Sequence, residues 1–205
     1  LHSSGSLSPA AIERTVSVIA QHADTARSLG ANTVTIVGTA ACRRAGNTSE
    51  LVAAVHNTTG LVLEVISPEE EARLSFAGAT RGLPELDTGS DVMVVDIGGG
   101  STEISIGTDT PLMSFSIPIG AVTATESDLT TDPPRPEDLT NVIGAVQDEL
   151  EEIGRTAPGA LTAGRVVGVA GTFVTVAAVE IGLAEWDDSA LHGFKLTREI
   201  GRAHV

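Results

Sequence analysis

A strand that runs directly into three consecutive glycines constrains this chain more than any other feature. Residues 92–97 read Val-Met-Val-Val-Asp-Ile, an apolar run typical of a buried strand, and Gly98, Gly99 and Gly100 follow at once. Another strand is expected at 103–107. Because glycines have no side chains, their backbone N–H groups can come close around an anion. The segment therefore predicts an anion-binding turn or an ordinary glycine-rich hairpin.

Polar side chains flank this turn. Ser101 and Thr102 add hydroxyl donors. Asp96 and Glu103 stand at the two ends of the turn, where carboxylates can hold a hard divalent cation directly or through its water. The common phosphate-binding motifs do not fit the sequence. There is no G-x-x-x-x-G-K-S/T, and Glu103 stands where a Rossmann G-x-G-x-x-G needs its last glycine.

A second glycine turn lies where a strand expected at 165–169 joins a helix expected at 172–181. It contains Gly168, Gly171 and Thr172. Its amides and the N-terminus of the helix can bind another anion, although such a turn alone is equally an ordinary strand-to-helix connection. Two such loops in one chain are typical of actin-like and sugar-kinase-like folds, which clamp a phosphate chain between two lobes.

The order of the expected elements divides the rest of the chain. Up to the helix that opens at residue 67, helices and strands alternate, which favours parallel βαβ units. We expect these elements at 8–29, 32–37, 49–57, 61–66 and from 67 onward. After a turn-rich linker at 84–90, three strands with short connections indicate an antiparallel meander, and a helix follows. These elements are expected at 92–97, 103–107, 113–117 and 136–154. We therefore predict two lobes, residues 1–87 and residues 88–205.

Charge and composition exclude several classes of partner. The net charge is −15, and aromatic residues make up 2% of the chain with no Tyr. Both values argue against nucleic acid, and the charge also argues against an anionic membrane. Cys42, the single cysteine, cannot form an intrachain disulfide, and no apolar run is long enough to span a bilayer. A cytoplasmic location is therefore expected.

Four stretches together resemble the exopolyphosphatase/guanosine pentaphosphate phosphohydrolase (Ppx/GppA) family. In chain order they are Gly38-Thr-Ala-Ala-Cys-Arg-Arg-Ala-Gly-Asn47, Ile66-Ser-Pro-Glu-Glu-Glu-Ala-Arg-Leu74, Asp96-Ile-Gly-Gly-Gly-Ser-Thr-Glu103, and Leu191-His-Gly193 with Leu196-Thr197. The resemblance covers residues 1–198. It implies an α/β fold of the actin-like, sugar-kinase-like and Hsp70-like (ribonuclease H-like) class with two lobes. It also implies a Mg²⁺- or Mn²⁺-dependent hydrolase of inorganic polyphosphate or guanosine pentaphosphate. A homodimer stays an open alternative for the intact protein.

The resemblance assigns roles to single residues. Glu71, directly before Ala-Arg, matches the catalytic base that activates water, although three successive glutamates also suit a helix N-terminus. Asp96 and Glu103 match the acids that handle the metal. Arg43 matches an arginine that reaches phosphate oxygens with its forked donors. The residues that match the two phosphate loops are Gly98, Gly99, Gly100, Ser101, Thr102, Gly168, Gly171 and Thr172. We interpret His192 as structural.

The sequence departs from the family pattern in a few places. The family's opening strand with its D-x-G-x-N-S phosphate loop is expected before Leu1, so the first lobe is expected to be incomplete and the chain alone inactive. Arg44 stands where the family usually has Asp, and Pro68 where it often has Gly; proline suits a first helical position. Residues 199–205 are interpreted as non-native.

Two other classes of function fit the same residues. An actin-like kinase or ATPase would use the same loops to bind ATP and pass phosphate to an acceptor. A non-catalytic sensor would bind polyphosphate or the alarmone without releasing phosphate. The Glu-Glu-Ala-Arg helix suits water activation and argues against the kinase. The presence of Glu71, Asp96 and Glu103 argues against the sensor.

Overall fold

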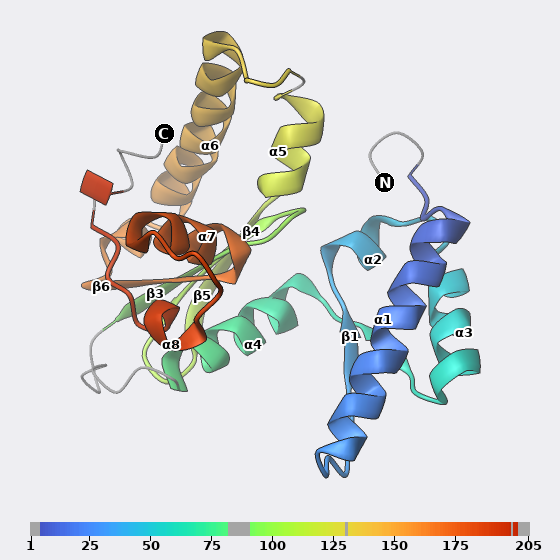
Figure 1. Ribbon diagram of the computed structural model, residues 1–205. Helices are drawn as coiled ribbons and strands as arrows, with labels where there is room; N and C mark the ends of the chain where they lie inside the picture. The colour runs from blue at the N-terminus through green and yellow to red at the C-terminus, as the bar shows by residue number, and fades with distance from the viewer. Residues whose placement is uncertain (1–4, 82–90, 130, 198, 201–205) are drawn as a thin grey trace. The chain divides into compact units, whose positions relative to one another are not determined.

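The computed structural model describes residues 5–81, 91–129, 131–197 and 199–200 (Figure 1). The chain forms two compact units, Leu1–Glu71 and Ala72–Val205. The division between them falls inside helix α4, Pro68–Arg81. The lobe boundary predicted near residue 88 lies outside the described residues, as do most of the residues interpreted as non-native.

The first unit contains one parallel βαβ arrangement, as its sequence pattern predicts. Its elements before α4 are α1 (Pro9–Ser28), β1 (Ile36–Gly38), α2 (Ala40–Arg44), α3 (Thr48–Thr59) and β2 (Leu63–Val65). β1 and β2 pair in parallel, with Ile36 opposite Leu63. Both strands are shorter than expected, and the short helix α2 replaces part of the expected loop after β1.

Apolar residues spaced by one helical turn build the core of this unit. Val16 of α1 packs with Leu51 and Val55 of α3 and with Leu63 of β2, and α1 lies beside α3 (Figure 1). The N-terminus of α1 is capped because the Ser8 hydroxyl accepts a hydrogen bond from the N–H of Ala11 at 3.2 Å. The helix expected at 8–29 is thus confirmed, and Val16 and Ala23 are its buried residues.

The second unit is a four-stranded mixed sheet with helices. Its strands are β3 (Val92–Ile97), β4 (Thr102–Gly107), β5 (Pro111–Ile117) and β6 (Arg165–Val169). They are ordered β5-β4-β3-β6, with β3 antiparallel to β4 and parallel to β6. The helices after β3 are α5 (Ala121–Ser127), α6 (Pro136–Thr156), a short 3-10 helix (Ala160–Thr162), α7 (Ala170–Ile181) and α8 (Asp188–Leu191). The predicted meander is confirmed, whereas α5 and α8 were not predicted.

Both faces of this sheet are covered, because alternate residues of β3 point to opposite sides. On one face Met93 packs with Ile106 of β4 and Ile153 of α6. On the other face Val92 and Val94 pack against Phe76 of α4, a fully buried side chain. This two-sided burial explains the continuous apolar run of β3.

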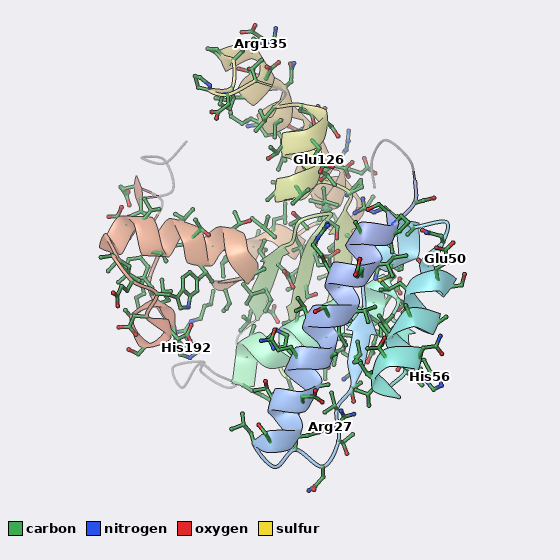
Figure 2. All side chains as sticks on the ribbon, turned by 45° about the vertical axis from the view of Figure 1, so that its right-hand side comes forward. Arg27, Glu50, His56, Glu126, Arg135 and His192 are labelled. Carbon is green, nitrogen blue, oxygen red and sulfur yellow. The ribbon has the colours of Figure 1, made fainter. Side chains whose placement is uncertain are left out.

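Helix α6 begins at an ion pair rather than at a capping hydroxyl. Arg135, which Figure 2 labels at the start of the helix, donates from Nε and Nη2 to the two carboxylate oxygens of Asp138, each at 2.8 Å. The hydrogen bond from Arg135 lowers the pKa of Asp138.

None of the helices in the described ranges has the length and hydropathy of a bilayer-spanning segment.

Candidate active site

The triple-glycine turn is held by its carbonyl groups. The turn closes through a hydrogen bond of 3.0 Å from the N–H of Gly98 to the carbonyl of Ser101. The carbonyl oxygens of Gly98 and Gly99 accept hydrogen bonds of 2.9–3.0 Å from the first N–H groups of α5, which are those of Ala121, Val122 and Thr123. The N-terminus of α5 is therefore satisfied by the turn, and the turn is fixed by the helix.

The N–H groups of the same turn are left without protein acceptors. Within the described part of the chain, no hydrogen bond is made by the N–H groups of Gly99, Gly100 and Ser101. Successive N–H groups in a turn of this kind form a concave site for an anion. Phosphate binding at Gly98, Gly99, Gly100 and Ser101 stays a prediction, and this geometry is compatible with it. The Thr102 hydroxyl instead donates to the carbonyl of Ile119 at 2.8 Å.

A substitution of Gly120 tests how tightly α5 holds the turn. A Cβ at Gly120 would lie 2.6 Å from the carbonyl oxygen of Gly98 and 2.7 Å from the backbone of Gly99. We expect Gly120→Ala to lower the free energy of unfolding by about 1–3 kcal/mol, because backbone atoms have to move apart. The control is Gly144→Ala in α6, where no atom lies within 4 Å of the new Cβ. Urea unfolding measures both variants, and equal stabilities would contradict the close approach.

The second glycine turn lies beside the first. β3 and β6 are parallel neighbours, with Asp96 opposite Val169, so their carboxyl ends meet at one edge of the sheet. The Thr172 hydroxyl, in the first turn of α7, donates to the carbonyl of Ile97 at 3.3 Å. Ligands of open α/β sheets bind at such edges. The structure thus brings together two loops that lie about 70 residues apart in the sequence.

The two glycines of the second turn differ in their surroundings. Gly168 lies in β6, and a Cβ there would lie 2.5 Å from the ring of Phe173, so packing against α7 requires a glycine at this position. Gly171 is exposed in the first turn of α7, and a Cβ added there would meet no atom within 4 Å. Ala170 between them has a φ of +68°, an unusual conformation for a residue with a side chain. Phosphate binding by Gly168 stays a prediction.

The two predicted metal-handling acids face each other across the hairpin. Asp96 is paired with Glu103 in the antiparallel register, which puts both side chains on the same face of the sheet. Glu103 is only 3% exposed, and its Oε1 accepts a hydrogen bond of 3.0 Å from the Ser116 hydroxyl. Oδ2 of Asp96 accepts a hydrogen bond of 2.6 Å from the Ser75 hydroxyl of α4.

The two carboxylates of Asp96 and Glu103 suit Mg²⁺ better than a metal ion that takes all its ligands from the protein. Among the described residues no group of three or more His, Cys, Asp or Glu side chains is placed to hold a metal ion. Two carboxylates supply hard oxygen donors, and Mg²⁺ commonly takes one or two carboxylates while water and substrate phosphates fill its other positions. Asp96 and Glu103 are the residues that would hold it.

In the first unit, the predicted base is paired with the predicted phosphate-binding arginine. Nη1 of Arg43 lies 2.8 Å from Oε2 of Glu71 and 2.9 Å from the carbonyl oxygen of Ile66. The two side chains are 21% and 16% exposed. Arg43 therefore fixes the direction of the Glu71 carboxylate, a contact that spans 28 positions of sequence.

The start of α4 explains the position of Glu71. The Ser67 hydroxyl accepts from the N–H of Glu70 at 3.2 Å, and the Ser67 carbonyl accepts from the N–H of Glu71 at 3.0 Å. Glu69 is fully exposed, and a hydrogen bond with the Ser67 side chain lowers its pKa. Of the successive glutamates, Glu71 is the one that Arg43 holds.

Some residues near the site carried no signal in the sequence. Ser75 and Ser116, which contact the two acids, are single hydroxyls on a helix and a strand, and neither belongs to a motif. Gly120 follows no recognisable turn pattern, although an isolated glycine before a short helix could have indicated a close approach of backbone. His192 is an exposed residue at the end of α8.

The similarity of the whole chain to known proteins agrees with these local features. The model of the Ppx/GppA phosphatase family matches residues 1–198. The chain belongs to this family. The family resemblance inferred from the four sequence motifs is thereby confirmed.

Comparison with individual members of the family shows what share of their length the chain covers. It is 36% identical over 193 residues to Exopolyphosphatase 2 of Mycobacterium tuberculosis, an alignment covering 92% of this chain and 60% of that protein. It is 33% identical over 174 residues to a putative exopolyphosphatase of Haemophilus influenzae, covering 84% of this chain and 53% of that protein. The chain therefore spans about half to two thirds of the length of these relatives.

A solved structure confirms the fold. The crystal structure of the Ppx/GppA family member of Aquifex aeolicus is similar to this chain with a TM-score of 0.78 and 32% sequence identity. The similarity covers 99% of this chain and 64% of the Aquifex chain. The predicted fold class, α/β and actin-like, is thus confirmed.

Proposed function

We propose that this chain belongs to an exopolyphosphatase-type phosphoanhydride hydrolase, which releases the terminal phosphate of inorganic polyphosphate. The observation that carries the proposal is the triple-glycine turn, whose carbonyls are held by α5 while the N–H groups of Gly99, Gly100 and Ser101 stay available to an anion. Asp96 and Glu103 border the same turn. The names of the relatives support polyphosphate as the substrate class.

The residues of the two units have different proposed roles. In the second unit, the N–H groups of the turn bind phosphate oxygens, as do the first N–H groups of α7 at Gly171 and Thr172. Asp96 and Glu103 would hold Mg²⁺ or Mn²⁺, which would neutralise charge on the phosphate. In the first unit, Glu71 is the general base, and Arg43 holds one of its oxygens in place.

The proposed reaction balances with water alone as the second reactant. A water oxygen attacks the terminal phosphorus and gives a proton to the Glu71 carboxylate. The bond from that phosphorus to the bridging oxygen breaks, and the bridging oxygen leaves with the shortened chain. Because the transition state of phosphoryl transfer is loose, positioning and charge neutralisation supply most of the rate enhancement. No covalent intermediate with the protein is required.

Guanosine pentaphosphate ends in the same type of anhydride bond, and the loops described above bind phosphate rather than a nucleobase. The test of the proposed function therefore compares polyphosphate with guanosine pentaphosphate. Phosphate release is measured with the full-length product of the gene, using polyphosphate, guanosine pentaphosphate and ATP in turn, with Mg²⁺ and with EDTA. We expect release from polyphosphate that EDTA abolishes.

Other outcomes would each replace the proposal. Tight binding of polyphosphate without release would indicate a sensor. Transfer of phosphate from ATP to an acceptor, without release from polyphosphate, would indicate an actin-like kinase. Faster release from guanosine pentaphosphate than from polyphosphate would keep the hydrolase and change its substrate.

A further inference from the structure

Ser75 of α4 hydrogen-bonds to Asp96, the acid at the start of the triple-glycine turn. Val92, Val94 and Asp96 are every second residue of β3, so they lie on the same face of the sheet, the face that α4 covers. Phe76, fully buried against Val92 and Val94, fixes α4 on this face. The neighbouring Ser75 hydroxyl consequently lies 2.6 Å from Oδ2 of Asp96.

The contact determines the direction of the Asp96 carboxylate. A hydroxyl that donates to a carboxylate at this distance makes a charge-assisted hydrogen bond, which is stronger and more directional than a neutral one. Within the described residues, the Asp96 side chain makes this one hydrogen bond, and its Oδ1 accepts none. One oxygen is thus held by α4, and the other remains available to a cation.

We propose that Ser75 is a positioning residue, which orients Asp96 toward a bound divalent cation. The inference rests on the proposed function, in which Asp96 and Glu103 hold Mg²⁺ or Mn²⁺. Partners that hydrogen-bond to a metal-ligating carboxylate fix its orientation, and their removal commonly weakens metal binding. A purely structural Ser75 would instead tie α4 to the sheet and affect only the stability of the fold.

The sheet offers a matched control for the loss of a serine hydroxyl. Ser105 lies on β4 opposite Val94, is 2% exposed, and its hydroxyl is 3.3 Å from that of Ser114. Ser105→Ala therefore removes a buried hydroxyl and its hydrogen bond from the same sheet without touching Asp96. Ser75→Thr keeps a hydroxyl at the position under test.

The experiment measures binding of Mn²⁺ alone to the full-length protein. Free Mn²⁺ is quantified by electron paramagnetic resonance for the wild type, Ser75→Ala, Ser75→Thr, Ser105→Ala and Asp96→Asn, and thermal unfolding is recorded for each. We expect Ser75→Ala to weaken Mn²⁺ binding by about 10–100-fold. Ser75→Thr and Ser105→Ala should bind Mn²⁺ like the wild type, and Asp96→Asn should lose the site.

The pattern across the variants separates two kinds of failure. If Asp96→Asn loses Mn²⁺ while Ser75→Ala binds it as tightly as Ser105→Ala does, the positioning role of Ser75 is overturned and the metal site stands. If Asp96→Asn binds Mn²⁺ like the wild type, the metal site of the proposed function is overturned, and the inference about Ser75 with it. A lower unfolding temperature for Ser75→Ala with unchanged Mn²⁺ affinity also overturns the positioning role.

Discussion

Replacing Glu71 with glutamine is expected to reduce phosphate release from polyphosphate by about 10²–10⁴-fold, the usual contribution of a general base. The amide keeps the size of the side chain and still offers an oxygen to Nη1 of Arg43, which lies 2.8 Å from the carboxylate in the structure. It cannot take a proton from water. The turnover rate of Glu71→Gln should therefore fall while polyphosphate binding, measured by calorimetry, stays close to that of the wild type.

Glu69→Gln is the control for this substitution. Glu69 lies on the same first turn of α4, is fully exposed, and hydrogen-bonds to the Ser67 side chain, with only a weaker electrostatic interaction with Arg43. The same chemical change there should leave turnover unaltered. Equal losses in the two variants would indicate that the acidic first turn acts through its charge at the helix N-terminus. Unaltered turnover of Glu71→Gln would remove Glu71 from the catalytic mechanism.

The elements predicted most accurately from the sequence are those with strong local signals. The bounds of β3 and β6 agree residue for residue with the prediction, because each is an apolar run that ends at a glycine turn. Helix α5 was missed. Its seven residues read Ala-Val-Thr-Ala-Thr-Glu-Ser, and threonine is a weak helix former. It forms because the carbonyls of Gly98 and Gly99 satisfy its first N–H groups, a contact between distant parts of the chain.

In the candidate site, too, contacts between residues close in sequence could be predicted, whereas contacts between distant residues could not. The pairing of Asp96 with Glu103 follows from a short hairpin, so the sequence was sufficient to predict that the two acids lie together. The ion pair between Arg43 and Glu71 joins two motifs whose contact no periodicity indicates. The Ser75 hydrogen bond depends on how Phe76 seats α4 on the sheet, which is decided by packing. Motifs thus indicate the candidate groups for the chemistry, whereas tertiary contacts decide which side chains orient them.

Replacing Asp96 with asparagine is expected to reduce Mg²⁺-dependent phosphate release by roughly 10²-fold or more, because a metal that neutralises phosphate charge contributes several kcal/mol to the transition state. Asparagine can still accept the hydrogen bond from Ser75, so the fold of the hairpin should persist. It lacks the negative charge that attracts Mg²⁺. The Mg²⁺ concentration for half-maximal release should therefore rise.

Asp109→Asn separates this effect from the general loss of an acidic residue. Asp109 is exposed between β4 and β5, and its substitution removes the same charge from the same sheet without reaching the glycine turn. We expect its Mg²⁺ dependence to match the wild type. If both variants shift the Mg²⁺ dependence equally, the ion responds to the overall charge of −15. A shift confined to Asp96→Asn would show instead that Mg²⁺ acts at the end of β3, because long-range effects of a single surface charge are screened at physiological salt.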